Sequence, residues 1–76
     1  PQLLKNVRFT SGEAPLETLA VRQAISDGEN RLGTTGRLLI RKSGTEPLIR
    51  VMGESEDEGL LHSVIQDIVN QISATA

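Results

Sequence analysis

The sequence predicts an α+β fold, a two-layer sandwich in which two helices pack on one face of a small, mostly antiparallel sheet. Near the C-terminus, aliphatic residues recur at helical spacing, and three shorter segments rich in β-formers are bounded by turn residues. Together with a second helical pattern they give the order β-α-β-β-α. The 76 residues form one domain, which we expect to be a piece of a longer protein because the chain starts at Pro1 and its only methionine is Met52.

The N-terminal half predicts a strand followed by a helix. Residues 2–9 are rich in β-formers and run into the turn sequence TSGEAP. Residues 16–32 predict a helix, with Pro15 suited to its first turn and Gly33 to its end. Gly28 in its interior weakens the helix by about 0.5–1 kcal/mol relative to alanine. The apolar stripe of this helix contains Leu16, Leu19, Ala20, Val21, Ala24, Ile25 and Leu32.

Two further strands are predicted at residues 36–42 (GRLLIRK) and 48–54 (LIRVMGE), separated by the hairpin-length loop SGTEP. Side chains alternate between the two faces of a strand. In the first strand, Leu38 and Ile40 face one way and Leu39 and Arg41 the other. In the second, Ile49 and Val51 share one face, and Leu48, Arg50 and Met52 share the other.

The last segment predicts a helix over residues 56–73. Its stripe steps alternately by one and three residues, through Leu60, Leu61, Val64, Ile65, Ile68, Val69 and Ile72. Ser55 with Glu58 three residues on is typical of a capping box, and Glu56 and Asp57 complement the positive end of the helix dipole. The acidic run ESEDE is therefore explained as a helix start.

Composition excludes several function classes. The chain has no cysteine, which excludes disulfides and thiolate metal sites and is compatible with the cytoplasm. Phe9 is the only aromatic residue, and the isoelectric point is near 5.2. This composition argues against nucleic-acid binding, which needs stacking platforms or a basic surface. No apolar run is long enough to span a membrane.

Positive charge is concentrated around the SGTEP loop. Residues 37–50 hold four of the eight basic residues and one acid, a net +3, which leaves −5 on the rest of a chain of net charge −2. Ser43 and Thr45 supply hydroxyls, and Gly44 lets backbone N–H groups turn toward an anion. Two guanidinium forks, Arg41 and Arg50, can grip one phosphate.

A second interpretation stays open, in which the loop is an ordinary polar turn whose arginines only solvate the sheet edge. Glu46 could orient one arginine, contact a ligand hydroxyl or simply be exposed. His62 has no second histidine or cysteine to form a metal site, and we expect it on the polar face of the last helix.

The run GRLLIRKSGTEPLIRVMGESEDE resembles the phosphate-binding segment of the α-D-phosphohexomutase superfamily. PQLLKNVRF at the start, PLE near residue 15 and the closing amphipathic helix occur in the order of that family's C-terminal domain, so the resemblance covers nearly the whole chain. Relatives acting on glucose or mannose phosphates often carry asparagine at the position of Gly44. Gly44 with Glu46 and Pro47 therefore favours the branch acting on glucosamine phosphates.

The resemblance implies that the chain is the last domain of a four-domain cytoplasmic mutase that makes amino-sugar precursors of the cell wall. By position, Arg41, Ser43, Gly44, Thr45 and Arg50 match the family's contacts to the non-reacting phosphate of the substrate. Lys42 and Glu46 match by sequence without a definite contact. The phosphorylated serine, the Mg²⁺ ligands and the sugar-binding loop belong to the earlier domains, so the chain alone is expected to bind no metal and to be catalytically inactive.

Other functions remain possible from the residues alone. A phosphomannomutase or phosphoglucomutase would carry a related loop. A regulatory domain that senses a small molecule is a hypothesis from another class, because β-α-β-β-α is also most of a ferredoxin-like ligand domain.

Overall fold

The computed structural model describes residues 1–10 and 14–75. Within them the elements are β1 (Gln2–Arg8), η1 (Pro15–Glu17), α1 (Leu19–Leu32), η2 (Gly33–Thr35), β2 (Gly36–Lys42), β3 (Leu48–Ser55) and α2 (Glu58–Thr75). The strands form one antiparallel sheet of order β1-β3-β2. This arrangement confirms the predicted α+β class and the order β-α-β-β-α. Part of the predicted turn after β1, residues 11–13, lies outside the described residues.

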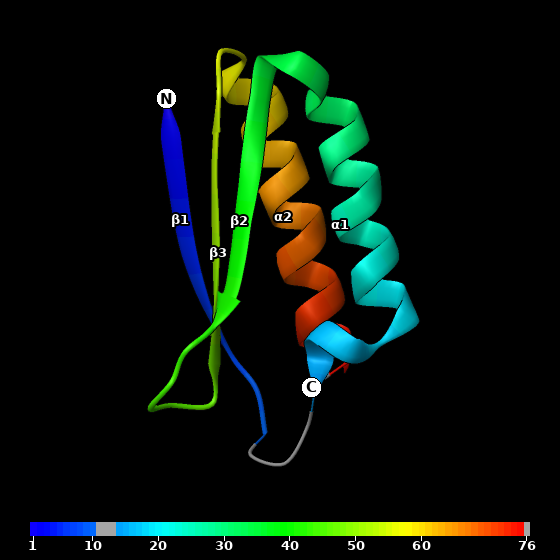
Figure 1. Cartoon of the computed structure of the whole chain (residues 1–76), viewed down its shortest axis with the longest axis vertical. Coiled ribbons are helices and arrows are strands. Elements are labelled where there is room, and N and C mark those ends of the chain that lie inside the picture. The colour runs from blue at the N-terminus through cyan, green and yellow to red at the C-terminus, as the bar shows by residue number, and fades with distance from the viewer. Residues whose placement is uncertain (11–13, 76) are drawn as a thin grey trace.

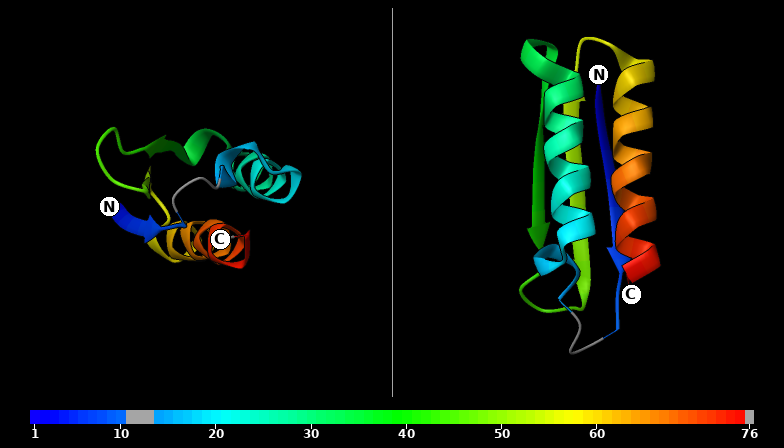
Figure 2. Two further views of the ribbon diagram at one scale, coloured as in Figure 1. Left: turned by 90° about the horizontal axis from the view of Figure 1, so that it is seen from below. Right: turned by 90° about the vertical axis from the view of Figure 1, so that its right-hand side faces the viewer.

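Both helices lie side by side on one face of the sheet, which leaves the other face open (Figures 1 and 2). The central strand β3 shows the alternation clearly. Ile49 and Val51 are 1% and 0% exposed and point into the core, whereas Arg50 between them is exposed on the open face. Leu38 and Ile40 of β2 pack against the same core. The predicted strand faces are therefore confirmed.

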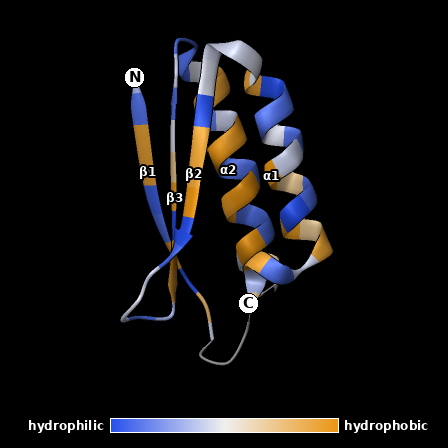
Figure 3. Cartoon of the chain, in the orientation of Figure 1, coloured by the Kyte–Doolittle hydropathy of each residue, from blue (hydrophilic) through white to orange (hydrophobic). Residues whose placement is uncertain are grey.

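The core lies between the sheet and the helices. Hydrophobic stretches on the strands and along α2 can be followed in Figure 3. The buried apolar residues are Val7, Phe9, Val21, Leu32, Ile49, Val51, Leu61, Val64, Ile65, Ile68 and Ile72. No helix in the described part of the chain is both long and apolar enough to cross a membrane.

The predicted stripe of α2 is confirmed, but its start is not. The helix begins at Glu58, and the carboxylate of Asp57 accepts a hydrogen bond from the backbone N–H of Leu60 at 3.0 Å. The buried hydroxyl of Ser55 instead accepts from the N–H of Asp57 at 3.0 Å. The prediction of Ser55 as part of a capping box is wrong, because β3 continues through Ser55 and leaves Asp57 to cap the helix.

The first helix also starts later than predicted. Residues 15–17 form a 3-10 turn, and extended Thr18 caps α1, its hydroxyl accepting a hydrogen bond from the N–H of Val21 at 3.3 Å. Leu19, assigned to the apolar stripe, is 77% exposed, and Ala20 is also exposed. These two residues form the first turn of the helix and point away from the core that Val21 enters.

Two glycines have different structural roles in α1: one ends the helix and the other allows close packing. Gly33 ends the helix with φ 55°, a left-handed conformation that glycine adopts without strain, and its N–H donates to the carbonyl of Glu29. Gly28 is buried where the two helices are close together: a Cβ added there would lie 2.7 Å from Cγ1 of Val64. The glycine that weakens α1 as an isolated helix therefore permits its packing against α2.

Replacing Gly28 with alanine is expected to lower the free energy of unfolding by up to about 2 kcal/mol. Inserting a methyl group into a packed interface costs about 1–3 kcal/mol, and the gain in helix propensity offsets at most about 1 kcal/mol of that. Gly59→Ala in α2 is the matched control, because a Cβ there meets only Asp57 Oδ1 at 3.7 Å. This control should keep or raise the stability. Urea denaturation of both variants tests the contrast, and a Gly28→Ala chain as stable as Gly59→Ala would contradict it.

Candidate functional site

The loop between β2 and β3, residues 43–47, folds around the hydroxyl of Ser43. The backbone N–H groups of Thr45 and Glu46 both donate to Ser43 Oγ at 3.4 Å. The N–H of Ser43 donates to the carbonyl of Leu48 at 2.9 Å, and the N–H of Leu48 donates to the carbonyl of Glu46 at 2.8 Å. Serine supports such local turns by accepting from its own backbone neighbours. Two amide groups of the loop therefore converge on one oxygen atom.

Arg41 and Arg50 stand directly opposite each other on β2 and β3, at the loop end of the sheet. Both are exposed, and both belong to the open face. Like charges in cross-strand pairs are destabilising unless something neutralises them. Neither arginine forms an ion pair with any acid that the structure describes, whereas three other arginines do: Arg8 with Glu46, Arg31 with Asp67 and Arg37 with Glu54. Two unpaired cations therefore lie beside the converging amides.

The first strand brings two further polar residues to this end of the sheet. Asn6 lies opposite Arg50 on its other side, which gives an Asn6–Arg50–Arg41 row across three strands. Arg8 pairs with Glu46 of the loop at 2.7 Å, and the neighbouring N–H of Phe9 donates to the carbonyl of Pro47 at 2.9 Å. Of the roles left open for Glu46, the structure shows an exposed carboxylate bound to an arginine of β1. The sequence alone did not predict Arg8 at this site, because its place depends on pairing between distant segments.

Lys42 does not join this group of side chains. It follows Arg41 on β2 and therefore belongs to the opposite face, where its ammonium lies 5.8 Å from the centre of the Phe9 ring. Gly44 is exposed, and a Cβ added to it would meet no described atom within 4 Å. Its φ is not positive. Neither a close contact nor a strained backbone in the described part of the chain therefore explains why position 44 is a glycine.

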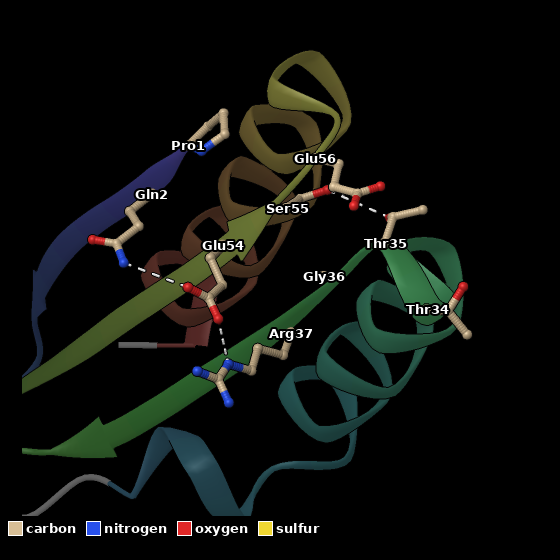
Figure 4. Close-up of a pocket in the computed structure, with 9 residues that line it drawn as sticks. All are labelled: Pro1, Gln2, Thr34, Thr35, Gly36, Arg37, Glu54, Ser55 and Glu56. Carbon is tan, nitrogen blue, oxygen red and sulfur yellow. Dashed lines mark hydrogen bonds and ion pairs between the residues drawn. The ribbon is translucent and has the colours of Figure 1, made fainter.

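A polar hollow lies at the other end of the sheet, beside the start of α2 (Figure 4), with a volume of about 550 Å³. Its lining consists of Pro1, Gln2, Thr34, Thr35, Gly36, Arg37, Glu54, Ser55 and Glu56. Here the charges satisfy one another: the Glu54 carboxylate accepts from Arg37 Nε and, at 3.4 Å, from Gln2 Nε2. The hydrogen bond from Arg37, with a smaller contribution from Gln2, holds the pKa of Glu54 below its ordinary value. We assign this hollow a structural role, in contrast to the loop end.

Arg37→Gln is expected to raise the pKa of Glu54, because it removes the main cause of the lowering. A carboxyl group whose pKa is lowered by folding stabilises the folded state above its unfolded pKa, about 4.3 for glutamate, and loses that contribution as the pH falls through the folded pKa. The difference in melting temperature between wild type and Arg37→Gln should therefore shrink in that acidic range. Carboxyl NMR titration and thermal melts measure both effects.

Arg22→Gln serves as the control for this titration. Arg22 is exposed on α1 and forms no ion pair with a described acid, so its loss changes the net charge equally without touching Glu54. A Glu54 pKa that stays the same in Arg37→Gln, or moves as much in Arg22→Gln, would contradict the assignment.

The described residues form no cluster of side chains typical of a metal site. No three His, Cys, Asp or Glu side chains among residues 1–10 and 14–75 gather closely enough to hold an ion. His62 is exposed on α2, as predicted, and Asp57 in the acidic run caps the helix. Both expectations, that this chain binds no metal and that Mg²⁺ is bound elsewhere in a longer protein, stay predictions.

Comparison with known proteins gives the chain its family. Residues 4–71 match the family model described as phosphoglucomutase/phosphomannomutase, C-terminal domain. The chain belongs to this family, as a C-terminal domain of the phosphohexomutase superfamily, which confirms the resemblance seen in the sequence.

Individual proteins similar in sequence to this chain are named as phosphoglucosamine mutases. The chain is 64% identical over 95% of its length to a phosphoglucosamine mutase of Jannaschia sp. (strain CCS1). It is 63% identical over its whole length to the phosphoglucosamine mutase of Parvibaculum lavamentivorans, and 63% identical over 97% to that of Rhodospirillum centenum. The chain spans only 16–17% of the length of these relatives.

Proposed function

We propose that this domain holds the non-reacting phosphate of a phosphosugar in an enzyme that interconverts glucosamine 6-phosphate and glucosamine 1-phosphate. The proposed contacts are Arg41, Ser43, Gly44, Thr45 and Arg50. The observation that carries the proposal is the facing pair Arg41 and Arg50, which has no acidic partner in the described chain and lies beside the hydroxyl-rich loop. An anion between the two guanidinium groups would remove their repulsion.

The loop supports the same proposal through its hydrogen bonds. The N–H groups of Thr45 and Glu46 reach Ser43 Oγ only at 3.4 Å, which is long for an N–H···O bond. A phosphate oxygen is a stronger acceptor and could draw these amides in. The open surroundings of Gly44 leave room for a ligand to approach the backbone. Pairing with Arg8 keeps the carboxylate of Glu46 neutralised beside this anion site.

The phosphoryl transfer itself we assign to residues outside this chain. A phosphate held by arginines and amides is positioned but not activated. No three His, Cys, Asp or Glu side chains among the described residues gather closely enough to hold a metal ion. The phosphorylated serine and the Mg²⁺ that stabilises the transferred charge would come from the rest of the enzyme. The purified 76-residue chain is accordingly expected to show no mutase activity.

Phosphomannomutase or phosphoglucomutase activity is the second candidate. The matching family model covers both of these enzymes. The named relatives are phosphoglucosamine mutases, and the glycine at position 44 agrees with the amino-sugar branch. The same relatives, matched over nearly the whole chain, favour a mutase domain over a sensory module.

Inorganic phosphate is expected to bind the isolated chain weakly, with a dissociation constant of about 1 mM, since only one part of the substrate site is present. In an NMR titration, the backbone amides of Ser43, Gly44 and Thr45 should shift first. Arg50→Ala should weaken the binding, whereas Arg22→Ala, which removes the same charge from α1, should not. Shifts centred on residues 55–62 at the start of α2 would show that the site has been misplaced.

In a full-length mutase carrying this domain, Arg50→Ala is expected to lower kcat/KM by about 10- to 150-fold. A hydrogen bond to a charged group contributes about 1.5–3 kcal/mol, and each 1.4 kcal/mol corresponds to about a factor of ten. Both KM and kcat should change, because binding energy from a remote phosphate also positions the reacting end. Arg50→Lys should recover only part of the loss, since an ammonium keeps the charge without the planar fork.

Thermal melts accompany these kinetics, because Arg50 is exposed and its loss should change the stability little. Arg22→Ala in the same enzyme is the matched control and should leave kcat/KM near the wild-type value. A folded Arg50→Ala enzyme with kcat/KM close to wild type would mean that the arginine pair only solvates the edge of the sheet.

A further inference from the structure

The open face of the sheet carries a row of apolar side chains that no described element covers. Leu4, Met52 and Leu39 are direct cross-strand neighbours on β1, β3 and β2. Leu4 is 53% exposed and Leu39 46%, and Met52 is partly exposed. We call these three residues the apolar strip. A hollow of about 780 Å³ lies over it.

The apolar strip is continuous with the proposed phosphate site. Side chains on one face of a strand recur every second residue, so the row Asn6–Arg50–Arg41 lies only about 7 Å further along the strands. Both helices pack on the opposite face (Figures 1 and 2). One surface therefore presents an anion site at the loop end and an uncovered apolar centre.

The missing part of the active site must face this surface. If the arginine row holds one end of the substrate, then the groups that transfer the phosphoryl reach its other end from the open side of the sheet. The proposed function assigns this chemistry to the part of the enzyme outside this chain. The part of the enzyme that performs it must therefore approach the face that carries the apolar strip.

The family assignment indicates that this part belongs to the same polypeptide, and the position of Pro1 in the fold is compatible with it. The matching family model is a C-terminal domain, and the chain spans only 16–17% of its relatives, so most of their length precedes the matched segment. The carbonyl of Pro1 accepts a hydrogen bond from the N–H of Ser55 at 3.2 Å, and the adjacent Gln2 lines the hollow over the strip. A chain leading into Pro1 would thus arrive at the border of this hollow.

We propose that the apolar strip docks against a preceding domain of the same polypeptide, an inference that rests on the proposed function. The docked surface is apolar at its centre, and it leaves the arginine row accessible to the phosphosugar between the two domains. This contact aligns the held phosphate with the transferring groups.

Single-cysteine reporters test the docking, because the chain contains no cysteine of its own. Leu39→Cys reports on the apolar strip, and His62→Cys, exposed on α2 in the other layer, is the matched control. Alkylation at each position is followed by peptide mass spectrometry in the 76-residue chain and in a full-length mutase carrying it, with and without a phosphosugar. Leu4→Cys on β1 repeats the measurement if Leu39→Cys lowers the melting temperature.

Both cysteines should react rapidly in the isolated chain. In the full-length enzyme, the cysteine at position 39 should react roughly ten-fold or more slowly, because alkylation then requires the docked surface to open, and the cysteine at position 62 should react as before. Equal rates at position 39 in both proteins, under both conditions, would overturn the proposal. Protection that grows with the concentration of the isolated chain would overturn it too, because it would identify a second copy as the occupant.

The outcome is separable from that of the proposed function. Loss of kcat/KM in Arg50→Ala depends on the arginine row and not on the strip. If that loss is found while position 39 stays reactive, then the docking inference alone fails.

Discussion

The alternation of side chains along β3 is the constraint on which the rest of the structure depends. As the central strand it is paired on both edges, so its register sets the faces of β1 and β2 as well. Ile49 and Val51 enter the core, which obliges Arg50 and Met52 to point to the open face. A slip of one residue would exchange the two sets and bury an arginine. The burial that stabilises the domain thus also displays its candidate site.

Among the described residues, charged side chains pair at one end of this sheet, whereas two arginines at the other end lack an acidic partner. At the start of α2, Arg37 and Gln2 satisfy Glu54 within the fold. At the loop end, Arg41 and Arg50 oppose each other and neither has an acidic partner among the described residues, although the loop itself contains an acid. That acid, Glu46, is bound to Arg8 instead. Local arrangements that disfavour stability in this way are expected where a protein binds something else, and this contrast is the basis for proposing a ligand site at the loop end.

Under the proposed function, a division of labour between domains explains why so small a chain leaves one sheet face uncovered. A domain of this size gains its stability from one core, which here lies between the helices and the inner face. In our proposals, the outer face holds the phosphate and meets another domain. Binding energy collected by residues that perform no chemistry can still serve the reaction by fixing the position of the substrate.

Local patterns by themselves determined most of the fold and part of the site. The stripe of α2, the faces of β2 and β3 and the hairpin loop follow from spacing along the chain, because helix and strand periods are local properties. The motif in the loop led to the same family that the comparisons show.

The exposure of Leu19 and the capping of α2 by Asp57 in place of Ser55 were decided by where each element ends, which packing and neighbouring strands control. Only the tertiary structure decided that Arg8 binds Glu46, that Asn6, Arg50 and Arg41 form one row, and that Leu4, Met52 and Leu39 form another. Each of these depends on the pairing of β1 with β3 across forty or more residues, and no local period carries the register of such distant strands.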